Sequence, residues 1–250
     1  ILMWFKNLYF FAFTRPFDCS EEDLEKQLSE HLFTPCASTE QSHFGWVNAL
    51  GKHGDSTVHA VNGNYLLCAR KEEKILPAPV VKDMIEQKVA QLEAEQSRGA
   101  TKKEKEQFKE DIIFELLPRA FSRFSDTRAY INAVHNIIVI DTSSRGKAED
   151  FLALLRKSLG TLPVTTPSPE KAPDEVMTEW LVESNLGANF QLGMEAEFNA
   201  LGDDGAVVRV KNQDLTSEEI KAHLDADKYV VKVALEWDES LSFILCDDLA

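Results

Sequence analysis

Two arginines four residues apart, Arg119 and Arg123, are the residues of this sequence best suited to bind a phosphate. A guanidinium group donates paired hydrogen bonds to phosphate oxygens. Pro118 favours the first turn of a helix, and residues four apart share a helical face, so we expect a short helix with a cationic face. Phe121 and Phe124 would form a second, aromatic face that suits contact with a protein surface. The alternative is a solvated arginine pair above two core phenylalanines.

The distribution of charge is compatible with a basic surface on an acidic protein. The formal net charge is −15, which by itself argues against a nucleic-acid partner. Residues 70–128 nevertheless hold 13 Lys and Arg against 12 Asp and Glu, whereas the rest of the chain holds 14 against 30. DNA binding would therefore require that the basic groups gather on one surface.

Motifs for catalysis are absent or weak. The chain has no Gly-x-x-x-x-Gly-Lys-Ser/Thr, Gly-x-Gly-x-x-Gly, Gly-x-Ser-x-Gly or His-Glu-x-x-His motif. The paired carboxylates Asp203-Asp204 and Asp247-Asp248 are of the kind that hold magnesium in nucleases, but a turn and a strand end explain them more simply. A zinc site would need closer spacing than that of Cys36, His43, His53 and His59. We therefore predict no enzyme activity, no metal and no cofactor.

The composition is that of an ordinary globular protein, with 44% apolar and 28% charged residues in a chain of 250. The longest apolar runs lie within 8–13 and 137–140 and are too short to span a bilayer. We read the N-terminal residues as a strand and expect no signal peptide. Four widely spaced cysteines without a Cys-x-x-Cys pair favour reduced thiols in the cytoplasm.

Hydrophobic periodicity and turn residues predict an α+β pattern on both sides of a helical excursion. Before it we expect a strand over 2–13, a helix that Ser20 caps, a loop over 36–55 and a hairpin of 58–61 with 65–69. After it we expect a hairpin of 127–134 with 137–141, a helix with Phe151, Leu155 and Leu159 inward, and a proline-rich linker over 161–173. The C-terminal part should contain helices around 176–183 and 195–201, a strand over 206–210, a helix capped at 216–219 and a hairpin of 229–237 with 241–246. The order strand, helix, two strands occurs in both halves, which suggests a βαββ repeat.

The excursion itself predicts two antiparallel helices. Val81, Ile85 and Val89 recur at helical spacing, and a break at 97–100 follows. Thr101-Lys102-Lys103-Glu104 is a capping box that starts a second helix. A helical hairpin of about 40 residues buries little by itself, so we expect it to lean on the main body or on a second subunit.

Several blocks of this chain resemble the RdgC family, the recombination-associated proteins of proteobacteria. The resemblance runs from end to end. It rests on Trp4-Phe5-Lys6-Asn7-Leu8, Ile75-Leu76-Pro77, the run from Leu117 to Ser125, the run from Leu154 to Gly160 and the run from Asp214 to Glu219. Family members continue well beyond the position of Asp248, so one interface is expected to be incomplete, and Asn212 stands where a basic residue is expected.

The resemblance implies a cytoplasmic, nucleoid-associated protein that binds DNA with little sequence preference and restrains the RecA recombinase. It implies a head-to-head, tail-to-tail homodimer closed into a ring, with duplex DNA in the hole. Such a ring can be acidic outside and basic inside, which reconciles DNA binding with the net charge. The resemblance leaves single-stranded DNA open as a further ligand, and it implies no membrane partner.

Together these arguments predict an α+β crescent with three lobes. The lobes are a central body of 1–75 plus 118–165, a helical-hairpin tip of 76–117 and an α+β base of 166–250. The expected DNA-binding residues are Lys74, Lys82, Lys88, Arg119, Arg123, Lys211 and Gln213, and Phe121 is the expected contact of the dimer. The expected mechanism is occlusion of DNA from RecA. The rivals are a module that binds RecA directly and a magnesium nuclease that uses Asp247-Asp248.

Overall fold

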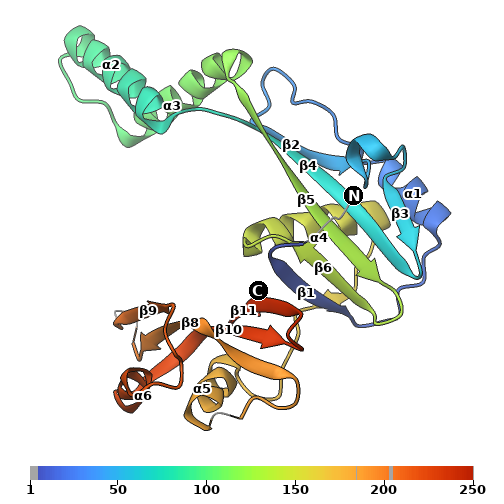
Figure 1. The fold of residues 1–250 in the computed structure, drawn as a ribbon. Helices are drawn as coiled ribbons and strands as arrows, with labels where there is room; N and C mark the ends of the chain where they lie inside the picture. Colours follow the sequence, from blue (N-terminus) through green and yellow to red (C-terminus); the bar gives the residue numbers. More distant parts are fainter. Residues whose placement is uncertain (1–4, 184, 203–204, 250) are drawn as a thin grey trace. The chain divides into compact units, whose positions relative to one another are not determined.

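The structure is a computed structural model, and it describes residues 5–183, 185–202 and 205–249 (Figure 1). These residues form six α-helices and two sheets, which confirms a mixed α/β protein. The chain divides into two compact units, one of residues 15–163 and one of residues 1–14 with 164–250. Within the described residues, no helix is long and apolar enough to cross a membrane.

The unit of residues 15–163 is built on an antiparallel sheet in the order β2-β4-β5-β6, with β3 also paired to β4. The central ladder joins β4 and β5 without interruption, from Asn64 opposite Asn132 to Lys74 opposite Ser122. The strands are β2 (Ser42–Val47), β3 (Val58–Val61), β4 (Asn64–Lys74), β5 (Ser122–Asn132) and β6 (Ile137–Asp141).

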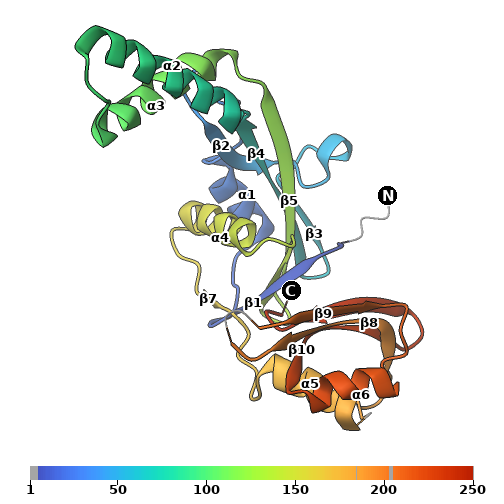
Figure 2. The same ribbon diagram turned by 90° about the vertical axis from the view of Figure 1, so that its left-hand side faces the viewer.

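Helices α1 (Glu21–Ser29) and α4 (Arg145–Leu159) lie on one face of this sheet (Figure 2). The core between these helices and the sheet contains Trp46 of β2, whose ring packs edge-on against Phe151 of α4 with the ring centroids 5.2 Å apart. The indole Nε1 of Trp46 donates a hydrogen bond of 2.8 Å to Ser158 Oγ. Alternate strand residues such as Ala129 and Ile131 are fully buried, as expected where one face of a sheet is covered.

The predicted helical hairpin is confirmed. Helices α2 (Ala78–Gln96) and α3 (Lys102–Leu116) extend from the same end of strands β4 and β5. The capping box is formed as expected, because Thr101 and Glu104 exchange their hydrogen bonds. Arg98 also pairs with Glu104 and is the main reason why the pKa of that carboxyl lies well below its ordinary value. Only one residue of each helix is buried, Val81 in α2 and Ile112 in α3.

The second unit contains a four-stranded antiparallel sheet in the order β11-β10-β8-β9. Its core packs Phe198 and Val233 of the sheet against Met177 and Ile220 of two helices. The elements are β1 (Leu8–Phe13) paired with β7 (Val164–Thr165), α5 (Pro173–Glu183), β8 (Phe190–Ala200), β9 (Val207–Lys211), α6 (Glu218–Asp225), β10 (Lys228–Trp237) and β11 (Leu241–Cys246).

Three predictions of local structure are wrong. The cationic helix expected from Pro118 is a short 3₁₀ turn, η2 (Leu117–Arg119), which leads into β5. The helix expected at 195–201 is the end of strand β8, where Ala196 and Phe198 are buried and alternate with Glu195 and Glu197. The segment expected to be loop contains strand β2 and a second 3₁₀ turn, η1 (Gly51–His53).

Candidate nucleic-acid interface

Arg119 and Arg123 do not share a helical face. Arg119 ends the 3₁₀ turn, and its Nη2 lies 3.5 Å from Glu115 Oε1 of α3. Arg123 is the second residue of β5, directly opposite Glu73 of β4. Its Nη2 donates a hydrogen bond of 2.7 Å to Glu73 Oε2. Both guanidinium groups remain largely exposed to solvent, so they can reach an external ligand from two separate elements.

An open groove lies where the hairpin joins the sheet. It has a volume of about 570 Å³ and is lined by Gln41, Ser42, Glu73, Lys74, Ile75, Leu76, Ile113 and Arg123. Two predicted DNA contacts, Lys74 and Arg123, therefore line one groove. The Lys74 side chain is mostly covered and its Nζ lies 3.8 Å from Glu72 Oε1, so Lys74 reaches a ligand only within the groove.

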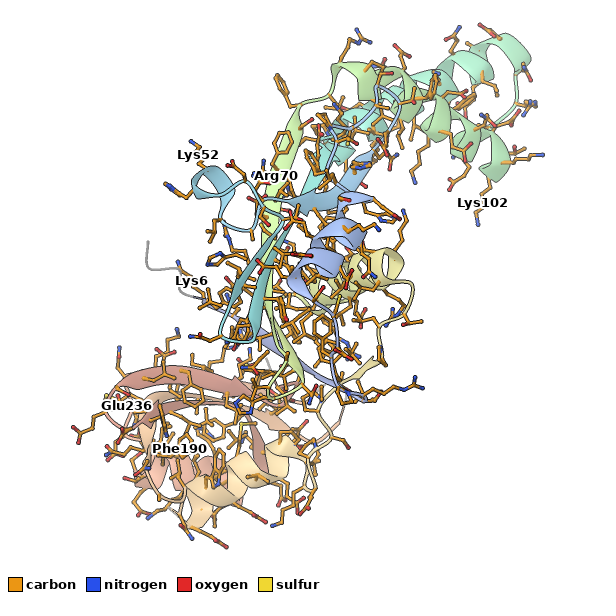
Figure 3. The ribbon with its side chains drawn as sticks, turned by 90° about the vertical axis from the view of Figure 1, so that its right-hand side faces the viewer. Lys6, Lys52, Arg70, Lys102, Phe190 and Glu236 are labelled. Atoms are coloured by element: carbon orange, nitrogen blue, oxygen red, sulfur yellow. The ribbon has the colours of Figure 1, made fainter. Side chains whose placement is uncertain are left out.

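The predicted cations of the hairpin are differently placed. The Nζ of Lys82 lies 3.7 Å from Glu86 Oε1, and both side chains are well exposed. Lys82 also lines a second groove of about 340 Å³, between α2 and Lys105 of α3. Lys88 is half-buried and makes no ion pair with a described residue. Lys102, by contrast, lies at the end of the hairpin remote from the sheet (Figure 3).

Lys211 and Gln213 belong to the second unit. Lys211 ends β9 opposite Glu195 of β8, and its Nζ lies 3.2 Å from Glu195 Oε2. Gln213 Nε2 donates hydrogen bonds to Ser217 Oγ at 3.2 Å and to Glu219 Oε2 at 3.1 Å. Gln213 is thus held by the start of α6, whereas the Lys211 side chain is largely exposed.

The carboxylates that accompany these cations are the part of the site that sequence patterns did not reveal. The hydrogen bond from Arg123 is the main cause that lowers the pKa of Glu73, so the carboxylate stays ionised at neutral pH. A phosphate that binds Arg123 must therefore compete with Glu73. Exposed ion pairs contribute about 1 kcal/mol or less, so replacing the Glu73 carboxylate by a phosphate as the partner of Arg123 loses little free energy. Knowing that Glu73 faces Arg123 requires the β4–β5 register, which no local pattern specifies.

The aromatic residues beside this groove are exposed rather than buried. Phe121 is 83% exposed, and Phe114, Phe124 and Ile75 are exposed as well. The alternative of a solvated arginine pair over core phenylalanines is therefore wrong. The backbone of Phe121 is nevertheless fixed, because its carbonyl oxygen accepts a hydrogen bond of 2.7 Å from the N–H of Ile75. The result is a pair of exposed apolar side chains, Ile75 and Phe121, at a groove that Ile75 lines together with two cations.

Comparison with known proteins places the chain in a family. The family model described as "Putative exonuclease, RdgC" matches residues 3–250. The chain is 79% identical over 248 residues to the recombination-associated protein RdgC of Colwellia psychrerythraea, covering 99% of this chain and 81% of that protein. The chain belongs to the RdgC family. It is 54% and 51% identical to the proteins of the same name from Aeromonas hydrophila and Tolumonas auensis, each over 99% of this chain and 82% of the relative.

The description of the RdgC family model as an exonuclease directs attention to metal ligands. The described residues include no group of three His, Cys, Asp or Glu side chains that could hold a metal ion. Burial and then the charge of Asp248 raise the pKa of Asp247, and Asp248 accepts a hydrogen bond of 3.0 Å from Tyr9. Asp203 and Asp204 lie outside the described residues.

Of the histidines that a metal site would use in this RdgC-family chain, His43 is held by two polar neighbours. His43 Nδ1 lies 3.2 Å from Glu40 Oε1, and its Nε2 lies 3.3 Å from Thr34 Oγ1. The four cysteines are free thiols. Burial raises the pKa of Cys68 to about 11, so this thiol is protonated at neutral pH.

Proposed function

We propose that this RdgC-family chain binds DNA without sequence preference and limits RecA-mediated recombination by occluding the DNA. The observation that carries the proposal is the set of exposed cations around the hairpin and its junction with the sheet, whose carboxylate partners are also accessible and readily exchanged for phosphates. The recombination-associated name of the relatives supports a role in recombination. The proposed location is the nucleoid in the cytoplasm.

We further propose that two copies close into a ring around duplex DNA. Support comes from Phe121, whose ring is exposed on a backbone held by a hydrogen bond, and from the exposed Ile75 beside it. Aromatic anchors of this kind are enriched among interface hot spots. In this proposal the Phe121 contact closes one of the two junctions of the ring.

The first prediction concerns salt. If on the order of 4–8 phosphates are neutralised, the logarithm of the binding constant should fall with the logarithm of salt concentration at roughly −0.9 per contact. Unrelated duplexes of equal length should bind alike, because backbone contacts carry no base information. Fluorescence anisotropy over a salt series measures both quantities. A salt-independent affinity, or a strongly preferred sequence, would contradict phosphate binding as the source of affinity.

The second prediction concerns Arg119. Arg119→Ala should weaken binding to all duplexes similarly and reduce the salt slope by about one. Its melting temperature should stay close to that of the parent, since an exposed ion pair contributes under about 1 kcal/mol. Both quantities come from the same anisotropy series and a thermal melt.

Arg145→Ala is the matched control for Arg119→Ala. The Arg119 and Arg145 side chains are 71% and 72% exposed. Each pairs with a helical glutamate four residues away, Glu115 of α3 and Glu149 of α4. Removing Arg145 should leave the salt slope unchanged, because it lies on α4 and outside the proposed interface. Equal effects of the two substitutions would mean that net charge, rather than a local contact, controls binding.

Two rival functions lead to different measurements. A module that binds RecA directly should show weak DNA affinity while still forming a complex with RecA. The description of the family model favours an exonuclease as the second candidate. Incubation of end-labelled DNA with the protein and magnesium tests it, with EDTA as the control. Magnesium-dependent loss of the label from the DNA would mean that the protein is a nuclease and does not act by occlusion.

A further inference from the structure

Glu72 carries a buried carboxylate at a point where three segments of the unit meet. The residue is 3% exposed and is the one charged residue among the buried residues of the described chain. Its carboxylate accepts hydrogen bonds from the N–H of Cys36 at 2.7 Å and from Ser122 Oγ at 2.5 Å. One side chain therefore joins the loop after α1, strand β4 and the start of β5.

The position of this carboxylate requires an explanation. Burying a charge is costly unless close partners compensate it, and the nearest ammonium nitrogen, that of Lys74, is 3.8 Å away. The hydrogen bonds from Ser122 and Cys36 lower the pKa of Glu72, so the group stays charged. An apolar side chain would fill the same space at less cost but would not fix the position of Ser122, because hydrophobic contacts have no direction.

Ser122 is the residue that follows Phe121. The backbone that follows the Phe121 side chain is thus held twice, by Ile75 N–H at the carbonyl oxygen of Phe121 and by Glu72 at the hydroxyl of Ser122. The ring itself is free of the core. An anchor whose backbone is already ordered loses less conformational entropy when it binds, which strengthens association.

We propose that Glu72 is a positioning residue for self-association, which fixes through Ser122 the backbone that presents Phe121 to a second copy of the chain. The inference rests on the proposed role of Phe121 in closing the ring. The occupant is a second copy rather than DNA, because the exposed side chains of Phe121 and of its hydrogen-bonded neighbour Ile75 offer apolar surface and no donor to a phosphate.

The test measures how long the protein stays on closed circular DNA at moderate salt. Ser122→Ala and Glu72→Gln should each shorten the residence time about three- to tenfold, the range expected when one anchor must be ordered on binding. Ser122→Ala should leave the initial affinity for short linear duplexes unchanged. In a Phe121→Ala background, both substitutions should have no further effect on residence time, because the group that they position is already gone.

Glu25→Gln is the matched control. The Glu25 carboxylate also accepts hydrogen bonds from a serine hydroxyl, that of Ser56, and from a backbone N–H, that of Thr57 at 3.0 Å. It lies in the same unit but holds a different loop, so Glu25→Gln should change thermal stability without changing residence time. Ser122→Ala removes only a hydroxyl group and keeps the test valid if Glu72→Gln folds poorly.

The possible outcomes separate this inference from the function on which it rests. If Phe121→Ala shortens residence while Ser122→Ala and Glu72→Gln do not, the role of Glu72 is wrong and ring closure by Phe121 stands. If the effects of Glu72→Gln and Phe121→Ala are fully additive, Glu72 acts elsewhere and the inference is also wrong. If Phe121→Ala has no effect, closure by Phe121 is wrong and the inference falls with it.

Discussion

Phe121→Ala should leave the fold intact and shorten residence on closed circular DNA by about 30-fold or more, as expected for an aromatic hot spot of about 2 kcal/mol. The side chain is 83% exposed, so its removal takes little apolar surface out of the core. The proposed dimer would keep its other junction and form an open horseshoe that still contacts DNA. Retention on closed circular DNA under flow, together with a thermal melt, measures both effects.

Val134→Ala provides the control for Phe121→Ala. Val134 is a 71% exposed apolar residue of the same unit, at the turn between β5 and β6. It should change neither melting temperature nor residence time. A large loss of stability in Phe121→Ala, or a residence time equal to that of the parent, would contradict the proposed role of Phe121 at the junction of the ring.

Trp46→Ala should be the most destabilising single substitution in the unit of residues 15–163, at about 3–5 kcal/mol. Trp46 is 1% exposed, packs on Phe151 and donates its indole hydrogen bond to Ser158. Trp46→Phe should cost less, because it keeps part of the ring volume and Ser158 retains its hydrogen bond to the carbonyl of Leu154. Urea unfolding followed by circular dichroism gives the free energies.

Trp237→Ala is the comparison for Trp46→Ala. Trp237 ends strand β10 and is exposed, so its loss should change the free energy of unfolding far less. If the two substitutions destabilise the protein equally, the core assigned to Trp46 does not control folding. DNA affinity per folded molecule should be the same in both variants, since neither residue lies at the proposed interface.

The sequence identified the helical hairpin because its signals are local. A capping box at Thr101 and a helical spacing of apolar residues need no knowledge of the rest of the fold. Strands β4 and β5 were predicted only where buried residues alternate, as at Ala129 and Ile131. Their polar extensions, Arg70–Lys74 and Ser122–Asp126, were missed because each extension has the other as its partner. When two polar segments pair only with each other, neither segment shows the alternation of apolar and polar residues that predicts a strand.

The wrong helices have the same physical origin. Arginine spacing and Pro118 favour a helix locally, and so do the Met, Glu and Ala residues near Glu195. In both places a neighbouring strand supplies the hydrogen bonds, and opposite charges face each other across the ladder, as Arg123 faces Glu73 and Lys211 faces Glu195. Tertiary pairing therefore outweighs helical propensity, which differs among ordinary residues by less than about 1 kcal/mol.

Strand β2 was missed for a different reason. It contains Gly45, a residue that weakens a strand interior and reads as a loop. The structure requires glycine there, because a Cβ atom would lie 2.6 Å from the Cα of Phe33. The chain after α1 runs beside this strand, and Phe33 N–H donates to the carbonyl of Trp46. A close approach of two backbones between distant residues cannot be inferred from one segment alone.

The arrangement of the hairpin on strands β4 and β5 has a mechanical consequence. Both strands join the hairpin at the same end of the sheet, so a force on the hairpin pulls both of them in one direction. The flanking ladders, β2 with β4 and β5 with β6, would then resist in shear. Since their hydrogen bonds are perpendicular to the strands, all of them are strained together, whereas a pull across the sheet opens them one pair at a time. The sheet is therefore stiffest along the direction in which the hairpin is attached.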